Sequence, residues 1–220
     1  MHSVKLPYKY GSEEMMNDLI TENMAKGLNL ESSIEEGNTI PNILEMQADL
    51  IVMGSKGKSN LEDKLFGSVA STVILESGIP VLVIPSDCSY SDFKSIIFTT
   101  DYRDHDLEAL QYTIDFAALF DAKITILHIA LKDNLESKIK FKGFKKLVTD
   151  KFDYSKMAFN LIIEEDFLSG LSSFLDEDKR KTDLLVATRY KKTFIQSLLK
   201  NSRIKQAGET EVPLMVLPGE

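Results

Sequence analysis

Four residues in the first half of the chain have the spacing of a phosphate-binding loop. Gly54, Gly57, Gly67 and Ser68 fit the pattern G-x2-G-x9-G-[ST]. Glycine tolerates positive φ angles and lets a ligand come close to the backbone, so the first two glycines can turn amide groups towards an anion. Gly67 and Ser68 can open a helix, whose first N–H groups and dipole favour negative charge. The pattern therefore predicts a site for phosphate groups.

The same residues also have a simpler interpretation, in which two glycines form an ordinary turn and Gly67-Ser68 caps a helix. Gly57-Lys58-Ser59 resembles the end of a Walker A loop, but the first glycine that such a loop needs falls at Val52. The position of the loop favours phosphate binding. It follows an apolar run, and open α/β sheets bind their ligands at the carboxyl ends of strands.

The elements around this loop occur twice in the chain. Ala48–Pro85 and Thr182–Pro218 each contain a short apolar run, a long loop, a helix, a proline and a second apolar run. Such internal similarity indicates two copies of one structural unit. We therefore predict a first unit over residues 1–90 and a second unit over residues 91–220.

Short apolar runs without alternation are typical of parallel strands that helices cover on both faces. The runs are Leu50–Met53, Val81–Ile84, Ser95–Thr100, Lys123–Ile129, Leu161–Glu164, Leu184–Ala187 and Leu214–Leu217. Helices are predicted from the cap Asp104 onwards, near Leu135–Asp150 and over Ser169–Leu175. Strands that alternate with helices indicate an α/β fold with two open parallel-sheet units.

The first unit contains no counterpart of Ser95–Ile126, so we expect it to be truncated at its N-terminus, without its first strand and helix. Met1–Val4 aligns instead with Leu127–Ala130. We expect the sheet of this unit to be split or incomplete. We also expect Val81–Ile84 and Leu214–Leu217 to be outer strands that pair antiparallel and join the units, since a tandem protein should cover its open edges.

Several of these motifs resemble those of a known family. The run LIVMG before the loop and PVLVIP after the helix resemble the ATP-binding type of universal stress protein. SIIFTTD and DAKITILHI in the second unit resemble the first two strands of the same family. The resemblance covers nearly the whole chain. It implies a tandem pair of adenine-nucleotide alpha-hydrolase-like units, assembly into dimers or larger homo-oligomers, and a role in stress response.

The resemblance also implies which residues contact the nucleotide. In the first unit they are Met53, Gly54, Gly57, Gly67, Ser68 and Val69. In the second unit a remnant of the site is formed by Thr100, Asp101, Ile129 and Ser202. The first unit has no counterpart of the acidic Asp101. The second unit has Thr188, Lys191 and Asn201 where the first has its three glycines. Each unit therefore lacks one part of the family's site.

We expect a regulatory protein that binds ATP, and the alternative is a protein-interaction module of the same fold without a ligand. No motif places a nucleophile or a general base, so no catalytic residue is predicted and weak ATP hydrolysis ranks third. A Mg²⁺ ion on the nucleotide phosphates is more plausible than a metal site of the protein alone, because the spacing of a zinc site is absent.

Charge and composition bear on the partners and the compartment. A net charge of -8 argues against nucleic acid as a partner, because such binding depends on neutralising phosphates. The basic run Lys138–Lys151 is better explained as a helix with Phe141, Phe144 and Leu147 on its inner face than as a nucleic-acid or membrane surface. The single cysteine, Cys88, and the lack of a long apolar stretch predict a cytoplasmic protein without a membrane partner.

Overall fold

The computed structural model describes residues 2–5, 17–18, 20–21, 29–33, 38–55, 67–86, 88, 92–177, 182–189, 195 and 212–219. The chain divides into two compact units, Met1–Gln47 and Ala48–Glu220. In the smaller unit, β1 (His2–Lys5) and β2 (Leu30–Ser33) form a parallel two-stranded sheet. The short helix α2 (Thr39–Leu44) follows them.

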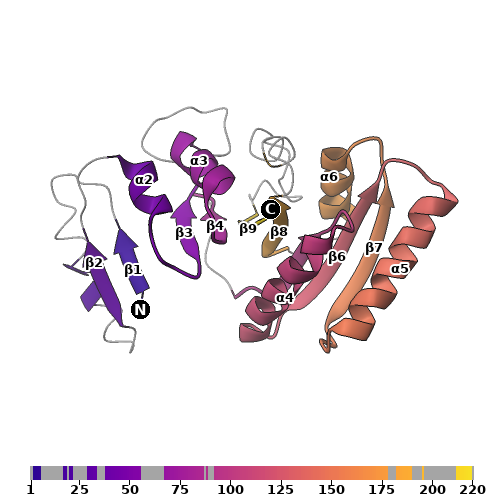
Figure 1. Ribbon diagram of the computed structural model, residues 1–220, viewed down its shortest axis with the longest axis horizontal. Helices are drawn as coiled ribbons and strands as arrows, with labels where there is room; N and C mark the ends of the chain where they lie inside the picture. The colour runs from indigo at the N-terminus through magenta and orange to yellow at the C-terminus, as the bar shows by residue number, and fades with distance from the viewer. Residues whose placement is uncertain are drawn as a thin grey trace. The chain divides into compact units, whose positions relative to one another are not determined.

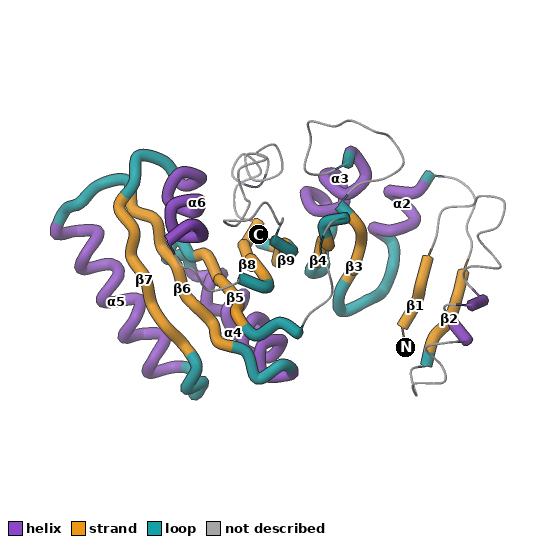
Figure 2. Tube along the Cα trace, turned by 180° about the vertical axis from the view of Figure 1, so that it is seen from behind, coloured by secondary structure: helices purple, strands orange, loops and turns teal. Residues whose placement is uncertain are grey.

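The larger unit is built on a seven-stranded sheet with the order β3-β4-β9-β8-β5-β6-β7, which Figures 1 and 2 show from opposite sides. Its strands are β3 (Ile51–Gly54), β4 (Val81–Ile84), β5 (Ser95–Thr99), β6 (Lys123–Ala130), β7 (Met157–Ile163), β8 (Leu184–Arg189) and β9 (Leu214–Pro218). Neighbouring strands run parallel except β4 and β9. The predicted α/β fold with open, mostly parallel sheets is confirmed.

Helices cover both faces of this sheet. They are α3 (Ser68–Glu76), α4 (Asp104–Leu119), α5 (Leu135–Lys151) and α6 (Phe167–Glu177). Apolar residues of α4 and α5 share one buried core with Phe98, Ile126 and Val186 of the sheet. On the opposite face α6 packs on β6, where Gly170 lies against Ile129, and Figure 2 shows α6 in front of the strands. Among the described helices, none combines the length and apolarity that a bilayer crossing requires.

Three details of the predicted elements are wrong. The predicted run Leu161–Glu164 covers only the last three residues of β7 and continues one residue beyond it, because Met157–Asn160 include the polar Asn160 and do not read as an apolar run. Asp104 is the first residue of α4 and not its cap, which is Arg103. Leu147 does not belong to the inner face of α5. Its side chain is 48% exposed, whereas Phe144 is buried.

The antiparallel pair that joins the two repeats is present. Val81 pairs with Val216, Leu82 with Met215 and Val83 with Leu214. Because this pair makes the sheet continuous, β4 and β9 lie inside it and are not outer strands of the finished sheet. The pair also ties the end of the first repeat into the sheet of the second. For this reason the compact units divide after Gln47 and not near residue 90.

The strands of the predicted first unit, residues 1–90, belong to two sheets, as expected: β1 and β2 form one, and β3 and β4 belong to the other. β8 pairs with β5 on one side and β9 on the other, whereas β3, at the same position of the first repeat, pairs only with β4 among the described strands. The consequence is visible at one repeated position. Val186 of β8 is completely buried, and Val52 of β3, 134 residues earlier in the sequence, is 59% exposed.

Candidate functional site

The predicted phosphate loop connects the carboxyl end of β3 to the amino end of α3. Its middle, residues 56–66 with Gly57, lies outside the described residues. Its two ends are joined by a hydrogen bond of 2.7 Å from the Gly67 N–H to the Ser55 carbonyl oxygen. The Ser55 N–H in turn donates to the Ile84 carbonyl oxygen at 2.9 Å. These bonds close the loop and fix its ends to β4.

The amino end of α3 is open to an anion. Gly67 is its N-cap, with extended backbone, and the Ser71 N–H is the first to reach a carbonyl of the helix, that of Gly67. The N–H groups of Ser68, Val69 and Ala70 therefore have no acceptor within the helix. The first turn of α3 carries no acidic side chain that would compete for the positive end of the dipole. The end of the loop is thus suited to a phosphate.

A buried hydroxyl next to the loop has no partner among the described residues. Ser55 is 1% exposed, and its Oγ makes no hydrogen bond that the described structure records. An unpaired buried hydroxyl costs about 1–3 kcal/mol, so such a group is a candidate for a bond to a ligand or a water molecule. The residues present therefore fit an anionic group at this loop.

In the second repeat, the turn after β5 is organised by one buried carboxylate. Oδ2 of Asp106 accepts from the Thr100 hydroxyl at 2.8 Å, from the Asp101 N–H at 2.9 Å and from the Arg103 N–H at 3.1 Å. Asp106 is 3% exposed. This carboxylate caps the start of α4 and at the same time sets the direction of the backbone at Asp101.

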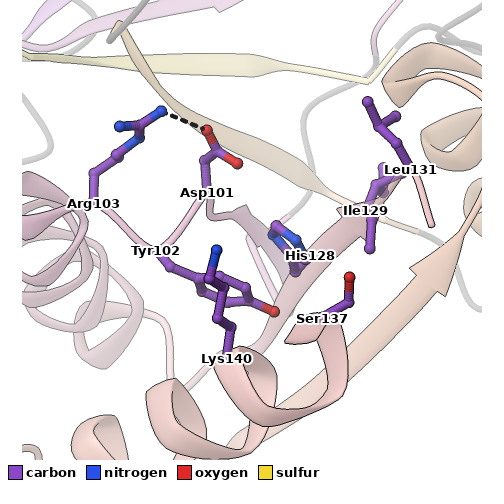
Figure 3. Close-up of a pocket in the computed structure, with 9 residues that line it drawn as sticks. Asp101, Tyr102, Arg103, His128, Ile129, Leu131, Ser137 and Lys140 are labelled. Atoms are coloured by element: carbon purple, nitrogen blue, oxygen red, sulfur yellow. Dashed lines mark hydrogen bonds and ion pairs between the residues drawn. The ribbon is translucent and has the colours of Figure 1, made fainter. Parts of the chain in front are cut away.

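A cavity of about 390 Å³ lies beside this turn, between the carboxyl ends of β5 and β6 and the first turns of α5. Its lining includes Asp101, Tyr102, His128, Ile129, Ser137 and Lys140 (Figure 3). The charges at its mouth are already paired, because Arg103 contacts Asp101 at 3.4 Å and Lys140 contacts Glu136 at 2.6 Å. The cavity is thus lined by polar groups but carries little free charge.

Tyr102 forms one wall of this cavity. Its backbone has a φ of 60°, in the left-handed region that is rare for a bulky residue. This conformation lays the ring on His128, with 3.9 Å between the centroids (Figure 3). The same ring lies against Phe144, at 5.0 Å between the centroids. Its hydroxyl is buried, and the described structure gives it no hydrogen-bond partner. Burial, and to a smaller extent the nearby Asp101, raise the pKa of this phenol above its ordinary value.

His128 is held in one tautomer below Tyr102. Its Nδ1 lies 2.7 Å from the Thr100 carbonyl oxygen, and since a carbonyl can only accept, Nδ1 carries the proton. Burial lowers the pKa of His128 below its ordinary value, against the opposing effects of the bond to Thr100 and of the carboxylates of Asp101 and Asp106. The folded protein therefore favours a neutral imidazole at this position.

We expect this histidine to make stability depend on pH. Its pKa is about 6.5 in the unfolded chain and lower in the folded one, so the unfolded chain binds the proton first. The contribution of the neutral imidazole to the free energy of unfolding is complete above about pH 6.5. It declines as the pH falls, by at most about 1.4 kcal/mol per pH unit. Urea unfolding from pH 7.5 to 5.5 should show a shallower decline for His128→Gln than for the unmutated chain. Equal declines would contradict this assignment.

The phosphate loop and the cavity lie beyond opposite ends of the strands of the sheet. β3 runs parallel to β4, and β4 runs antiparallel to β9, whose direction β8, β5 and β6 share. The carboxyl end of β3, with Gly54, therefore faces the opposite way from the carboxyl end of β5, with Asp101. Among the described residues, the predicted site residues at the end of β3 and those at the end of β5 do not form one composite site.

The residues predicted to contact the nucleotide divide between the phosphate loop and the cavity. Met53 and Val69 are half-buried at the end of β3 and in the first turn of α3, while Gly54 and Ser68 are exposed. Asp101 and Ile129 line the cavity, but the Thr100 hydroxyl turns inward to Asp106. Ser202 lies outside the described residues.

Sequence reasoning missed several residues of the cavity, namely Tyr102, His128, Ser137 and Lys140. Their only signal was position, because each follows or flanks the end of a predicted strand or the start of a predicted helix. Within the described part of the chain, no three His, Cys, Asp or Glu side chains gather as the ligands of a metal ion would.

Comparison with known proteins finds a family match for part of the chain. Residues 19–85 match the universal stress protein family. A universal stress protein of Methanocaldococcus jannaschii is 38% identical over 90 residues, which are 34% of this chain and 53% of that protein. One of Mycobacterium tuberculosis is 36% identical over 62 residues, or 27% of this chain and 21% of that protein. The chain thus spans about half the length of the first relative and about a fifth of the second.

The fold is shared over a longer stretch. The crystal structure of a universal stress protein from Archaeoglobus fulgidus aligns with a TM-score of 0.70 over 99% of this chain and 86% of that one. The sequence identity in this alignment is 16%, so the likeness establishes the fold and not the ligand.

Proposed function

We propose that this chain, whose residues 19–85 match the universal stress protein family, is a stress-response regulatory protein that binds ATP at its first-repeat glycine loop. The observation that supports this most is the closure of the loop by the bond from the Gly67 N–H to the Ser55 carbonyl. It places the open end of α3 beside the carboxyl end of β3, where sheets of this class bind ligands.

The described residues suggest how the phosphates would be held. Among the described residues, the N–H groups of Ser68, Val69 and Ala70 and the hydroxyl of Ser55 are donors that could bind the phosphates, and the Ser68 hydroxyl would add another. A Mg²⁺ ion would be carried by the phosphates themselves. We assign no catalytic residue, since binding and not bond cleavage is the proposed activity. Cytoplasmic location and assembly into homo-oligomers remain parts of this proposal.

Exchanging the residue at the end of each repeated loop, Gly67 or Asn201, tests the site. We expect Gly67→Val to weaken binding of fluorescently labelled ATP by about tenfold or more, because a branched side chain crowds the amides that approach the phosphates. The matched variant Asn201→Val changes the same position of the second repeat and should bind as tightly as the unmutated chain. Equal losses in both variants, or full binding by Gly67→Val, would remove the site assignment.

The alternative is an interaction module of the same fold that binds no nucleotide. The separation of the two half-sites favours it, because the strand directions place Asp101 at the end of the sheet opposite the loop at Gly54. ATP titration of the unmutated chain discriminates between the two functions. No saturable binding up to millimolar ATP would favour the interaction module.

A further inference from the structure

A side chain of the second repeat contacts the helix that ends the phosphate loop of the first. Arg189 is the last residue of β8, and its Nη1 donates to the Ile74 carbonyl oxygen of α3 at 3.1 Å. Ile74 belongs to the last turn of α3, where the final carbonyls receive no hydrogen bond from an N–H group of the same helix. The arginine therefore satisfies a carbonyl that the helix itself leaves free.

The backbone of Arg189 is held firmly enough to make this contact a defined one. It pairs in register with Pro218 of β9, and β9 forms the antiparallel pair with β4. Gly219 packs so closely that a Cβ at its position would lie 2.9 Å from the Arg189 carbonyl oxygen. From this anchored position the side chain reaches past the junction of the two repeats to α3.

The charge of Arg189 suits the end of the helix that it contacts. The carboxyl end of a helix is the negative end of its dipole, and a cation there stabilises the helix. The last turn of α3 has no basic residue of its own. Partial burial lowers the pKa of Arg189, but from a value so high that the guanidinium stays charged. Arg189 thus supplies from the second repeat the cation that α3 lacks.

Arg189 stands in the second repeat at a position that belongs to the phosphate loop in the first. Arg189 lies 134 residues after Ser55, so it occupies the position that follows the first glycine of the loop in the first repeat. We propose that Arg189 is a positioning residue for the first-repeat phosphate loop: it holds α3 by its carboxyl end so that the amino end meets the ligand. The second repeat would then have lost its own loop and become a support for the other one. This inference rests on the proposed ATP site.

The experiment compares ATP affinity and backbone protection in the full chain. We expect Arg189→Gln to weaken ATP binding about three- to tenfold, and Arg189→Lys, which keeps the charge, to weaken it less. Lys146→Gln removes one positive charge from α5, where Lys146 pairs with Asp150, and should leave the affinity unchanged. Hydrogen–deuterium exchange without ATP should become faster over α3 in Arg189→Gln and stay the same over α4.

The outcomes separate this inference from the proposed function. Arg189→Gln with unchanged affinity, in a chain that binds ATP, would overturn the positioning role. Equal weakening by Lys146→Gln would also overturn it, because a general charge effect would then suffice. If the unmutated chain binds no ATP, the proposed function fails. The exchange measurement alone then decides whether Arg189 holds α3, and unchanged exchange over α3 would reject that as well.

Discussion

Replacing Asp106 by alanine is expected to lower the free energy of unfolding by about 3–5 kcal/mol. The carboxylate accepts from two backbone N–H groups and from the Thr100 hydroxyl in a position that is 3% exposed. Alanine leaves these donors without an acceptor, and each buried unpaired group costs about 1–3 kcal/mol. The turn that holds Tyr102 at a φ of 60° would lose its main support at the same time.

Two further variants make this prediction specific. Asp104→Ala removes an exposed carboxylate from the same turn of α4 and should cost less than about 1 kcal/mol. Asp106→Asn keeps one carbonyl oxygen as an acceptor and should fall between the two. Urea unfolding followed by circular dichroism measures all three. A similar loss for Asp104→Ala and Asp106→Ala would show that only the helix dipole is at work and not the buried network.

Strands that are plain apolar runs could be predicted from the sequence because such a run is a local feature, whereas β2 and the first part of β7 were missed. β4 and β9 are apolar runs that follow a proline, and the structure places both within a residue of the predicted bounds. Their antiparallel pairing was also predictable, since two similar units with open edges can cover them by joining. What the pairing implies for the site is less direct. The antiparallel pair makes the carboxyl ends of β3, with Gly54, and of β5, with Asp101, point in opposite directions. This becomes clear only when the strand directions are traced through the whole sheet.

The cavity could not be predicted, because it depends on contacts between residues that are distant in the sequence. Tyr102 takes a positive φ only where Asp106 and Thr100 fix its neighbours, and its ring then meets His128 and Phe144. No local pattern announces such a conformation in a tyrosine. Arg189 shows the same limitation, since its partner Ile74 lies 115 residues earlier in the chain.

A charge introduced at the junction of the repeats is expected to have the largest effect. Val83 is completely buried, pairs with Leu214 across the antiparallel junction and has Met53 as its parallel partner. An aspartate there must be buried among apolar side chains without a partner, which costs several kcal/mol even when it takes up a proton. We expect Val83→Asp to lower the free energy of unfolding by more than about 4 kcal/mol.

The neighbouring strand offers the matched control. Val52→Asp makes the same substitution on β3, but Val52 is 59% exposed, so its carboxylate stays hydrated and should cost less than about 1 kcal/mol. Urea unfolding of both variants at pH 7 compares a buried with an exposed valine in adjacent strands. A loss for Val83→Asp within about 1 kcal/mol of that for Val52→Asp would show that β4 and β9 do not hold the repeats together. A large loss for Val83→Asp alone would make their antiparallel pair the structural basis of the continuous sheet.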